Sequence, residues 1–120
     1  MINWNPLNNE TQLGQVVEQS HQNPCLIFKH STRCSISTVA KHKLEKNWHF
    51  GAETLQPYYI DLLAYRGVSN AVSVLFGVHH ESPQVLLIVK GECVYDESHN
   101  GINVADIADE LKKHGLDGQY

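Results

Sequence analysis

The sequence lacks the features that mark several common classes of protein. Three cysteines, widely spaced and without a C-x-x-C pair, predict neither a disulfide framework nor a zinc site. No apolar run is long enough to span a membrane, and the opening segment MINWNPLNNETQ has neither the basic nor the apolar part of a secretory leader. A formal net charge of -4 offers no basic surface to nucleic acid or to an anionic membrane. We therefore expect a single cytoplasmic domain over residues 1–120, with free thiols and no metal, nucleic-acid or membrane partner.

What the sequence does contain is a regular alternation of helical and strand patterns. Apolar spacings of three and four predict helices over 9–20, 34–48, 67–76 and 103–114, and apolar or β-branched runs predict strands over 25–30, 57–62, 84–90 and 93–95. In the second helix the buried face is expected to comprise Ile36, Val39, Ala40, Leu44 and Trp48. A frayed tail is expected beyond Gly115. This order predicts an α/β, thioredoxin-like fold in which helices flank a four-stranded mixed sheet, with an N-terminal helix and a C-terminal β-hairpin plus helix.

A cysteine stands where the first predicted strand gives way to a helix. Cys34 follows the apolar run and opens the helical pattern, and its neighbours Thr32, Arg33 and Ser35 are polar, which indicates that the thiol is exposed. The free N–H groups of a helix start, together with the charge of Arg33, favour the thiolate over the thiol. Thr32, Ser35 and Ser37, the other polar residues of the motif, are expected to help stabilise the thiolate. Ser37 stands three residues after the thiol, where a dithiol oxidoreductase has its second cysteine. The motif can exchange disulfides but cannot close one within itself.

The residues around this cysteine resemble a known family. The stretch Lys-His-Ser-Thr-Arg-Cys-Ser-Ile-Ser, residues 29–37, resembles the signature of the YtxJ-type monothiol bacilliredoxins, which are thioredoxin-fold proteins of bacillithiol-producing bacteria. A Trp-plus-Leu segment near the N-terminus, the Ser82-Pro83 step before a strand, and the final hairpin and helix extend the likeness over nearly the whole chain. Ser35 departs from the family, which commonly has proline after the cysteine and so a stiffer helix start.

The resemblance implies an activity and a set of site residues. It implies a monothiol thiol-disulfide oxidoreductase in which Cys34 removes bacillithiol, or a similar low-molecular-weight thiol, from protein mixed disulfides. Bacillithiol would be the thiol co-substrate, and bacillithiolated client proteins the partners. The family also implies a cis bond before Pro83 that turns the backbone of Ser82 towards the thiol and the substrate. By analogy with glutaredoxins, the turn containing Gly101 and Asn103 is expected to bind a carboxylate of the small thiol.

The sequence also allows other interpretations of the cysteines and histidines. Cys93 could resolve the active cysteine and make a dithiol enzyme, or the chain could be a thioredoxin-fold binding or scaffold module with an incidental thiol. Cys25 begins an apolar strand and is expected to be a structural residue. His79 and His80 are interpreted as solvated loop residues rather than metal ligands. His30 either tunes the protonation of the thiol or is a satisfied imidazole at the strand end.

Overall fold

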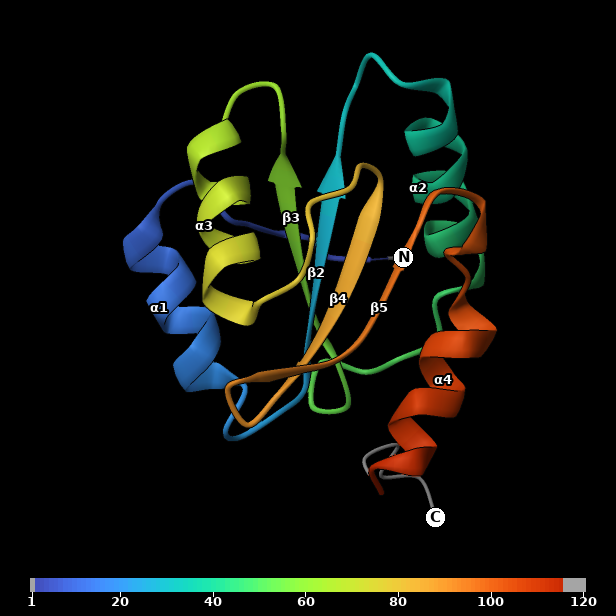
Figure 1. Ribbon diagram of the computed structural model, residues 1–120. Coiled ribbons are helices and arrows are strands. Elements are labelled where there is room, and N and C mark those ends of the chain that lie inside the picture. The colour runs from blue at the N-terminus through green and yellow to red at the C-terminus, as the bar shows by residue number, and fades with distance from the viewer. Residues whose placement is uncertain (1, 116–120) are drawn as a thin grey trace.

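The computed structural model describes residues 2–115 and shows a five-stranded sheet between two pairs of helices (Figure 1). The predicted frayed tail lies outside the described residues. The elements in chain order are β1 (Asn5–Pro6), α1 (Glu10–Gln19), β2 (Cys25–His30), α2 (Ser35–Asn47), β3 (Gln56–Asp61), α3 (Arg66–Phe76), β4 (Gln84–Val89), β5 (Glu92–Ser98), the short 3-10 helix η1 (His99–Gly101) and α4 (Val104–Lys113).

The sheet is mixed, and β2 lies at its centre. The strand order is β1-β3-β2-β4-β5, with β1, β3 and β2 parallel, β4 antiparallel to β2, and β5 antiparallel to β4. The helix α2 makes the crossover between the parallel strands β2 and β3. The Lys90-Gly91 turn has positive φ at both residues, which suits the tight connection between β4 and β5. The predicted layout is therefore observed, although the predicted number of strands is wrong by one.

The strand that the sequence pattern missed is β1. Only Asn5 and Pro6 belong to it, and they pair with Tyr58 and Tyr59 of β3. The N–H of Leu7 extends the contact by donating to the carbonyl of Tyr59 at 2.9 Å. Two residues, one of them a proline, are too few to show the alternation by which a strand is recognised.

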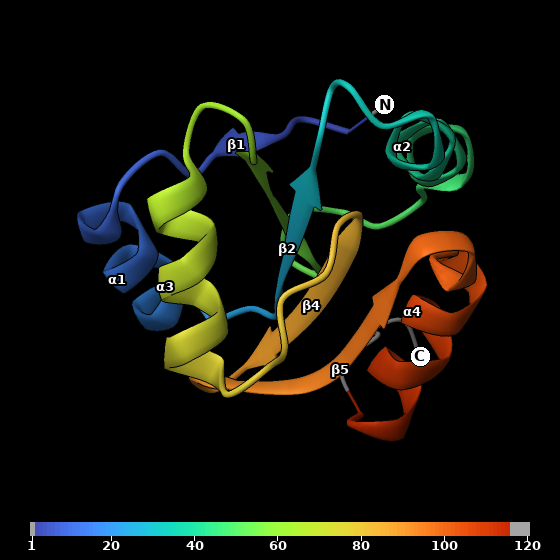
Figure 2. The same ribbon diagram turned by 45° about the horizontal axis from the view of Figure 1, so that its top comes forward.

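Helices α1 and α3 cover one face of the sheet, and α2 and α4 cover the other (Figure 2). Each face has its own hydrophobic core. Successive residues of β2 point to opposite faces, so Phe28 packs beneath α2 and α4 whereas Ile27 packs beneath α1 and α3. Both side chains are fully buried. The core under α2 and α4 includes Leu26, Leu44, Leu87, Ile107 and Leu111, and the other core includes Leu13, Val16, Val68, Val72 and Leu86.

The buried face of α2 differs from the predicted one. Ser37, Ala40 and Leu44 are buried, whereas Ile36 is 41% exposed and Val39 is 55% exposed. Ile36 and Val39 each precede a buried residue by one position, which is about 100° of rotation around the helix. The prediction failed because it counted only apolar residues and so excluded Ser37, which helps to define the face that packs on the sheet.

Candidate functional site

The candidate nucleophile lies at the end of β2 where the chain turns into α2. The turn is closed by the Cys34 N–H, which donates to the carbonyl of Ser31 at 3.1 Å. Cys34 is the N-cap of α2, with extended dihedral angles of -108° and 118°, and its carbonyl accepts the Thr38 N–H at 3.0 Å. The sequence had placed it one position later, in the first turn. The thiol is half-exposed and makes no capping hydrogen bond, so it is free to react.

Ser37 holds this turn from below. Its side chain is fully buried, and its Oγ accepts the N–H of Ser31 at 3.0 Å. The same hydroxyl forms a hydrogen bond with Nδ1 of His30. The Ser37 hydroxyl, at the position of a second cysteine, therefore makes two hydrogen bonds. They hold residues 30 and 31, the segment that leads into the Cys34 turn.

His30 is a buried imidazole beneath the turn. Its ring lies 5.6 Å from that of Phe28 and 5.7 Å from that of Tyr59, measured between centroids. Burial lowers the pKa of His30, and the charge of Lys41 lowers it further, while Asp61 acts in the opposite direction. The ring is thus neutral near pH 7 and is satisfied by Ser37, in agreement with the second of the two interpretations of His30.

The other predicted motif residues surround the thiol at the surface. Thr32, Arg33 and Ser35 are exposed, and Ser35 is the first residue of α2. No side-chain hydrogen bond or ion pair joins these three residues to any other within residues 2–115. Their assistance to the thiolate remains a prediction.

The Ser82-Pro83 bond is cis, as the resemblance implied. Pro83 is buried and immediately precedes β4, whose first residue, Gln84, pairs with Lys29 of β2. The step therefore adjoins the end of β2 that leads into the Cys34 turn. The carbonyl of Pro83 accepts the N–H of His99 at 3.0 Å. The Ser82 hydroxyl is buried and has no hydrogen-bond partner among the described residues.

The turn before α4 is occupied by its own contacts. Asn103 caps the helix by accepting the Asp106 N–H at 2.8 Å, and its amide donates to the Gly101 carbonyl and to the Asp106 carboxylate at 3.0 and 2.9 Å. These contacts occupy the Asn103 side chain, which was expected to bind a carboxylate of the small thiol. The negative charge of Asp106 also opposes a second carboxylate there. Carboxylate binding by Gly101 and Asn103 remains a prediction that these contacts do not favour.

The two remaining cysteines lie far from the candidate nucleophile. Cys25 pairs with Ile88, which in turn pairs with Cys93, so both thiols lie at the level where β2 begins. From there to the far end of β2 is about 16 Å at about 3.3 Å per residue. A disulfide needs Cα atoms within about 7 Å. Cys93 therefore cannot resolve Cys34 in this fold, and the dithiol alternative is wrong for the structure described.

Chemical labelling should separate the three thiols. Burial raises the pKa of Cys25 to about 12 and that of Cys93 to about 11. At pH 8 both thiols are therefore almost entirely protonated, and the thiolate is the reacting form. We expect iodoacetamide to modify Cys34 alone in the folded protein and all three cysteines in urea, as measured by peptide mass mapping. Cys93 is half-exposed, as Cys34 is, so comparable labelling of Cys93 before unfolding would contradict the raised pKa of its thiol.

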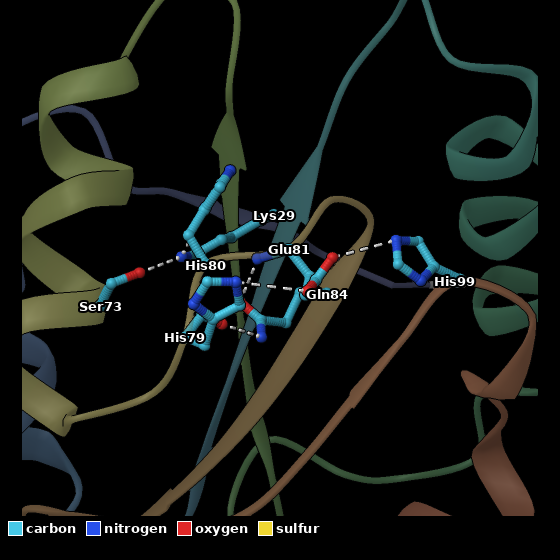
Figure 3. Close-up of polar contacts among 7 residues, drawn as sticks. All are labelled: Lys29, Ser73, His79, His80, Glu81, Gln84 and His99. Atoms are coloured by element: carbon cyan, nitrogen blue, oxygen red, sulfur yellow. Dashed lines mark hydrogen bonds and ion pairs between the residues drawn. The ribbon is translucent and has the colours of Figure 1, made fainter.

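A second polar cluster on the opposite face of β2 was missed by the sequence analysis. Lys29 is fully buried, and its Nζ lies 3.2 Å from Nδ1 of His80 and 3.0 Å from the Ser73 hydroxyl (Figure 3). The interpretation of His80 as a solvated loop residue is therefore wrong, whereas His79 is almost fully exposed. The signal that could have revealed the cluster was a lysine inside an otherwise apolar strand, because a buried ammonium requires polar partners.

The described residues contain neither a metal centre nor a spanning helix. Within residues 2–115 no three His, Cys, Asp or Glu side chains are arranged to hold a metal ion. None of the helices in that range has the length and apolar character needed to cross a membrane.

A thioredoxin-like sheet with one half-exposed cysteine at the start of α2, and a bound serine three residues later, defines a thioredoxin-fold oxidoreductase with a monothiol motif. Residues 5–107 match the family model of the monothiol bacilliredoxin BrxC, and the chain belongs to this family of thiol-disulfide oxidoreductases.

Solved structures support the same fold. One protein described as having a thioredoxin fold is 30% identical, has a TM-score of 0.76, and aligns over 88% of this chain and 90% of its own. The thioredoxin of Trypanosoma brucei brucei is 10% identical with a TM-score of 0.73, covering 93% of this chain and 90% of its own. The thioredoxin of Malassezia sympodialis is 13% identical with a TM-score of 0.71, covering 95% and 92%. The thioredoxin-like fold predicted from the sequence is confirmed.

Proposed function

We propose that this protein removes bacillithiol from bacillithiolated client proteins in the cytoplasm, using Cys34 as its only reacting thiol. The observation that carries the proposal is the pairing of a half-exposed cysteine at the helix start with a buried, doubly bound serine at the third position after it. Membership of the monothiol bacilliredoxin family supports bacillithiol as the co-substrate.

The reaction follows from disulfide exchange at a single sulfur. The Cys34 thiolate attacks the bacillithiol sulfur of the client mixed disulfide, a new S–S bond forms, the old one breaks, and the client leaves as a thiolate that takes up a proton. The protein then carries bacillithiol on Cys34. A second low-molecular-weight thiol, as its thiolate, attacks the bacillithiol sulfur of this adduct, forms a soluble disulfide and releases the Cys34 thiolate. No electrons are gained or lost by the protein over the cycle.

Ser37 and the positions of the other cysteines make the second thiol necessary. The Ser37 hydroxyl cannot form a disulfide, and it is held by Ser31 and His30. Cys25 and Cys93 lie at the other end of β2. Release of the adduct therefore depends on a thiol from solution, which is the behaviour expected of a monothiol enzyme.

Backbone contacts next to Pro83 are proposed to hold the substrate. An extended segment of the client or of the small thiol would lie along Ser82, whose position beyond the β2–β4 ladder leaves its backbone outside the strand pairing. Thr32, Arg33 and Ser35 would border the same opening from the turn. Arg33 supplies the positive charge that suits a carboxylate-bearing thiol.

Intact-mass analysis tests this proposal directly. The reduced protein is exposed to oxidised bacillithiol and, in parallel, to glutathione disulfide, and the adduct is mapped to a residue. We expect one bacillithiol per chain on Cys34, formed faster than the glutathione adduct and removed by free bacillithiol. Loss of two hydrogens without an adduct would instead show an internal disulfide. An unmodified Cys34 would favour a binding module with an incidental thiol.

A further inference from the structure

The Lys29 ammonium is buried without a carboxylate partner. Its Nζ donates to the Ser73 hydroxyl at 3.0 Å and to Nδ1 of His80 at 3.2 Å, and none of the ion pairs within residues 2–115 involves it (Figure 3). Burial lowers the pKa of Lys29 to about 8, so the group is still mainly charged at pH 7. Such a group costs stability unless its neutral partners hold it closely. A buried charge that costs stability suggests that Lys29 has a function beyond packing.

Lys29 fixes the protonation state of His80. Nδ1 can accept from the ammonium only when it carries no proton, so the ring is neutral with its proton on Nε2. The Ser69 hydroxyl lies 3.3 Å from the same nitrogen. Burial lowers the pKa of His80, and Lys29 on β2 lowers it further.

Other charged groups around the His80 ring act more weakly. Arg66 on α3 and His79 beside it in the loop also lower the pKa of His80, whereas the Glu81 carboxylate raises it. Together these groups lower the pKa of His80, so its ring stays neutral down to a lower pH than the ring of an ordinary histidine.

Lys29 and its partner in the ladder hold the segment that leads to Pro83. Gln84, which pairs with Lys29 and is itself buried, donates from Nε2 to the carbonyl of His79 at 2.9 Å, and its Oε1 accepts the N–H of Glu81 at 3.4 Å. The Gln84 side chain thus binds residues 79 and 81, and the Lys29 side chain binds residue 80. The next residues in the chain are Ser82 and Pro83.

We propose that Lys29 and His80 are positioning residues that set the Ser82 backbone for the mixed disulfide, and that protonation of His80 releases this segment and weakens substrate binding. The inference rests on the proposed function, which supplies the substrate. It assigns a role in substrate binding to two residues on the face of the sheet that α1 and α3 cover. Neither residue touches the reacting sulfur atoms; each acts through the loop.

The matched variants are Lys29→Met and His80→Asn. Methionine keeps the length of the side chain and removes the buried charge, so the fold should be as stable as that of the wild type or more stable. Without the ammonium the loop loses its anchor, and KM for a bacillithiolated peptide should rise about tenfold while kcat changes little, the size expected for loss of one hydrogen bond to a charged group. A purely structural lysine would give an unchanged KM and would refute the inference.

His80→Asn tests the pH dependence. The asparagine Oδ1 replaces Nδ1 as the acceptor and does not titrate. The wild-type KM should stay constant from pH 7.5 down to about 6.5 and rise at lower pH as His80 gains a proton, because the pKa of His80 is lowered from 6.5; the KM of His80→Asn should stay near the wild-type neutral value throughout. His30, whose pKa is also lowered, remains in this variant, so an acid limb that persists would assign the effect to His30 and overturn the proposal.

Hydrogen exchange separates this inference from the proposed function. Amide exchange at Glu81 and Ser82 is measured by NMR in the wild type, Lys29→Met and His80→Asn, without any substrate. Faster exchange in Lys29→Met alone supports the anchor, and equal rates in all three proteins contradict it. If the wild type fails to turn over bacillithiolated peptide, the proposed function fails, and the exchange rates still decide whether Lys29 and His80 hold the loop.

Discussion

Replacing Cys34 with alanine is expected to reduce the removal of bacillithiol to the uncatalysed background. The other two thiols are poor nucleophiles because burial raises the pKa of Cys25 to about 12 and of Cys93 to about 11. They also lie at the far end of β2 from the turn. The measurement is the release of bacillithiol from a labelled client peptide. Appreciable catalysis by Cys34→Ala would show that the chemistry does not occur at this sulfur.

Two further variants control for the surroundings of the thiol. Cys93→Ala should retain the wild-type rate because Cys93 takes no part in the exchange. Ser37→Ala should still exchange disulfides but lose about 1–3 kcal/mol of unfolding free energy, because it leaves the Ser31 N–H and the His30 ring without their partner. A Ser37→Ala protein that folds normally and cannot exchange would give Ser37 a chemical role, contrary to the mechanism proposed.

The largest loss of stability is expected from Phe28→Ala. Phe28 is fully buried in β2, and its ring lies 5.6 Å from that of Trp4 and 5.6 Å from that of His30. Truncation removes most of this packing and leaves a cavity below the site, so the free energy of unfolding should fall by about 3–5 kcal/mol. Urea denaturation monitored by circular dichroism measures the loss.

Phe28→Leu is the matched control for that cavity. Leucine fills most of the space without the aromatic contacts, so the loss should be about 1–2 kcal/mol. Equal losses in the two variants would mean that the aromatic contacts, rather than the filled volume, account for the stability. In that case the packing of Trp4 and His30 would require the aromatic ring of Phe28.

The elements that the sequence predicted well are those with a strong apolar signal. The six residues of β2 are all buried, so the predicted run and the observed strand coincide at Cys25–His30. The cap of α4 was likewise recognisable, because an asparagine directly before an apolar helical pattern is a common N-cap, and the Asn103 side chain accepts the Asp106 N–H. Cys34 was placed to within one residue, since a strand followed by a helix leaves few positions for the turn.

The features that the sequence missed depend on contacts between distant segments. β1 exists only because β3 presents a free edge to Asn5 and Pro6. The contact of Lys29 with His80 joins residues 51 positions apart, and nothing local to either one indicates the other. Ser37 was expected to assist the thiolate, but its buried hydroxyl turned out to bind His30 and Ser31. Polar residues in a core are understood only once their partners are known.

The two outer strands also determine how this chain behaves towards copies of itself. β1 is two residues long and contains Pro6, which has no N–H to offer to a neighbouring strand. β5 carries Glu92, Asp96 and Glu97, and its pairing with β4 is irregular at Leu87 and Ile88. Open edges that are short, charged or irregular resist pairing with another sheet. The sheet is therefore a poor template for aggregation, and the half-exposed thiol of Cys34 can stay open to solvent without the sheet edges joining copies of the chain.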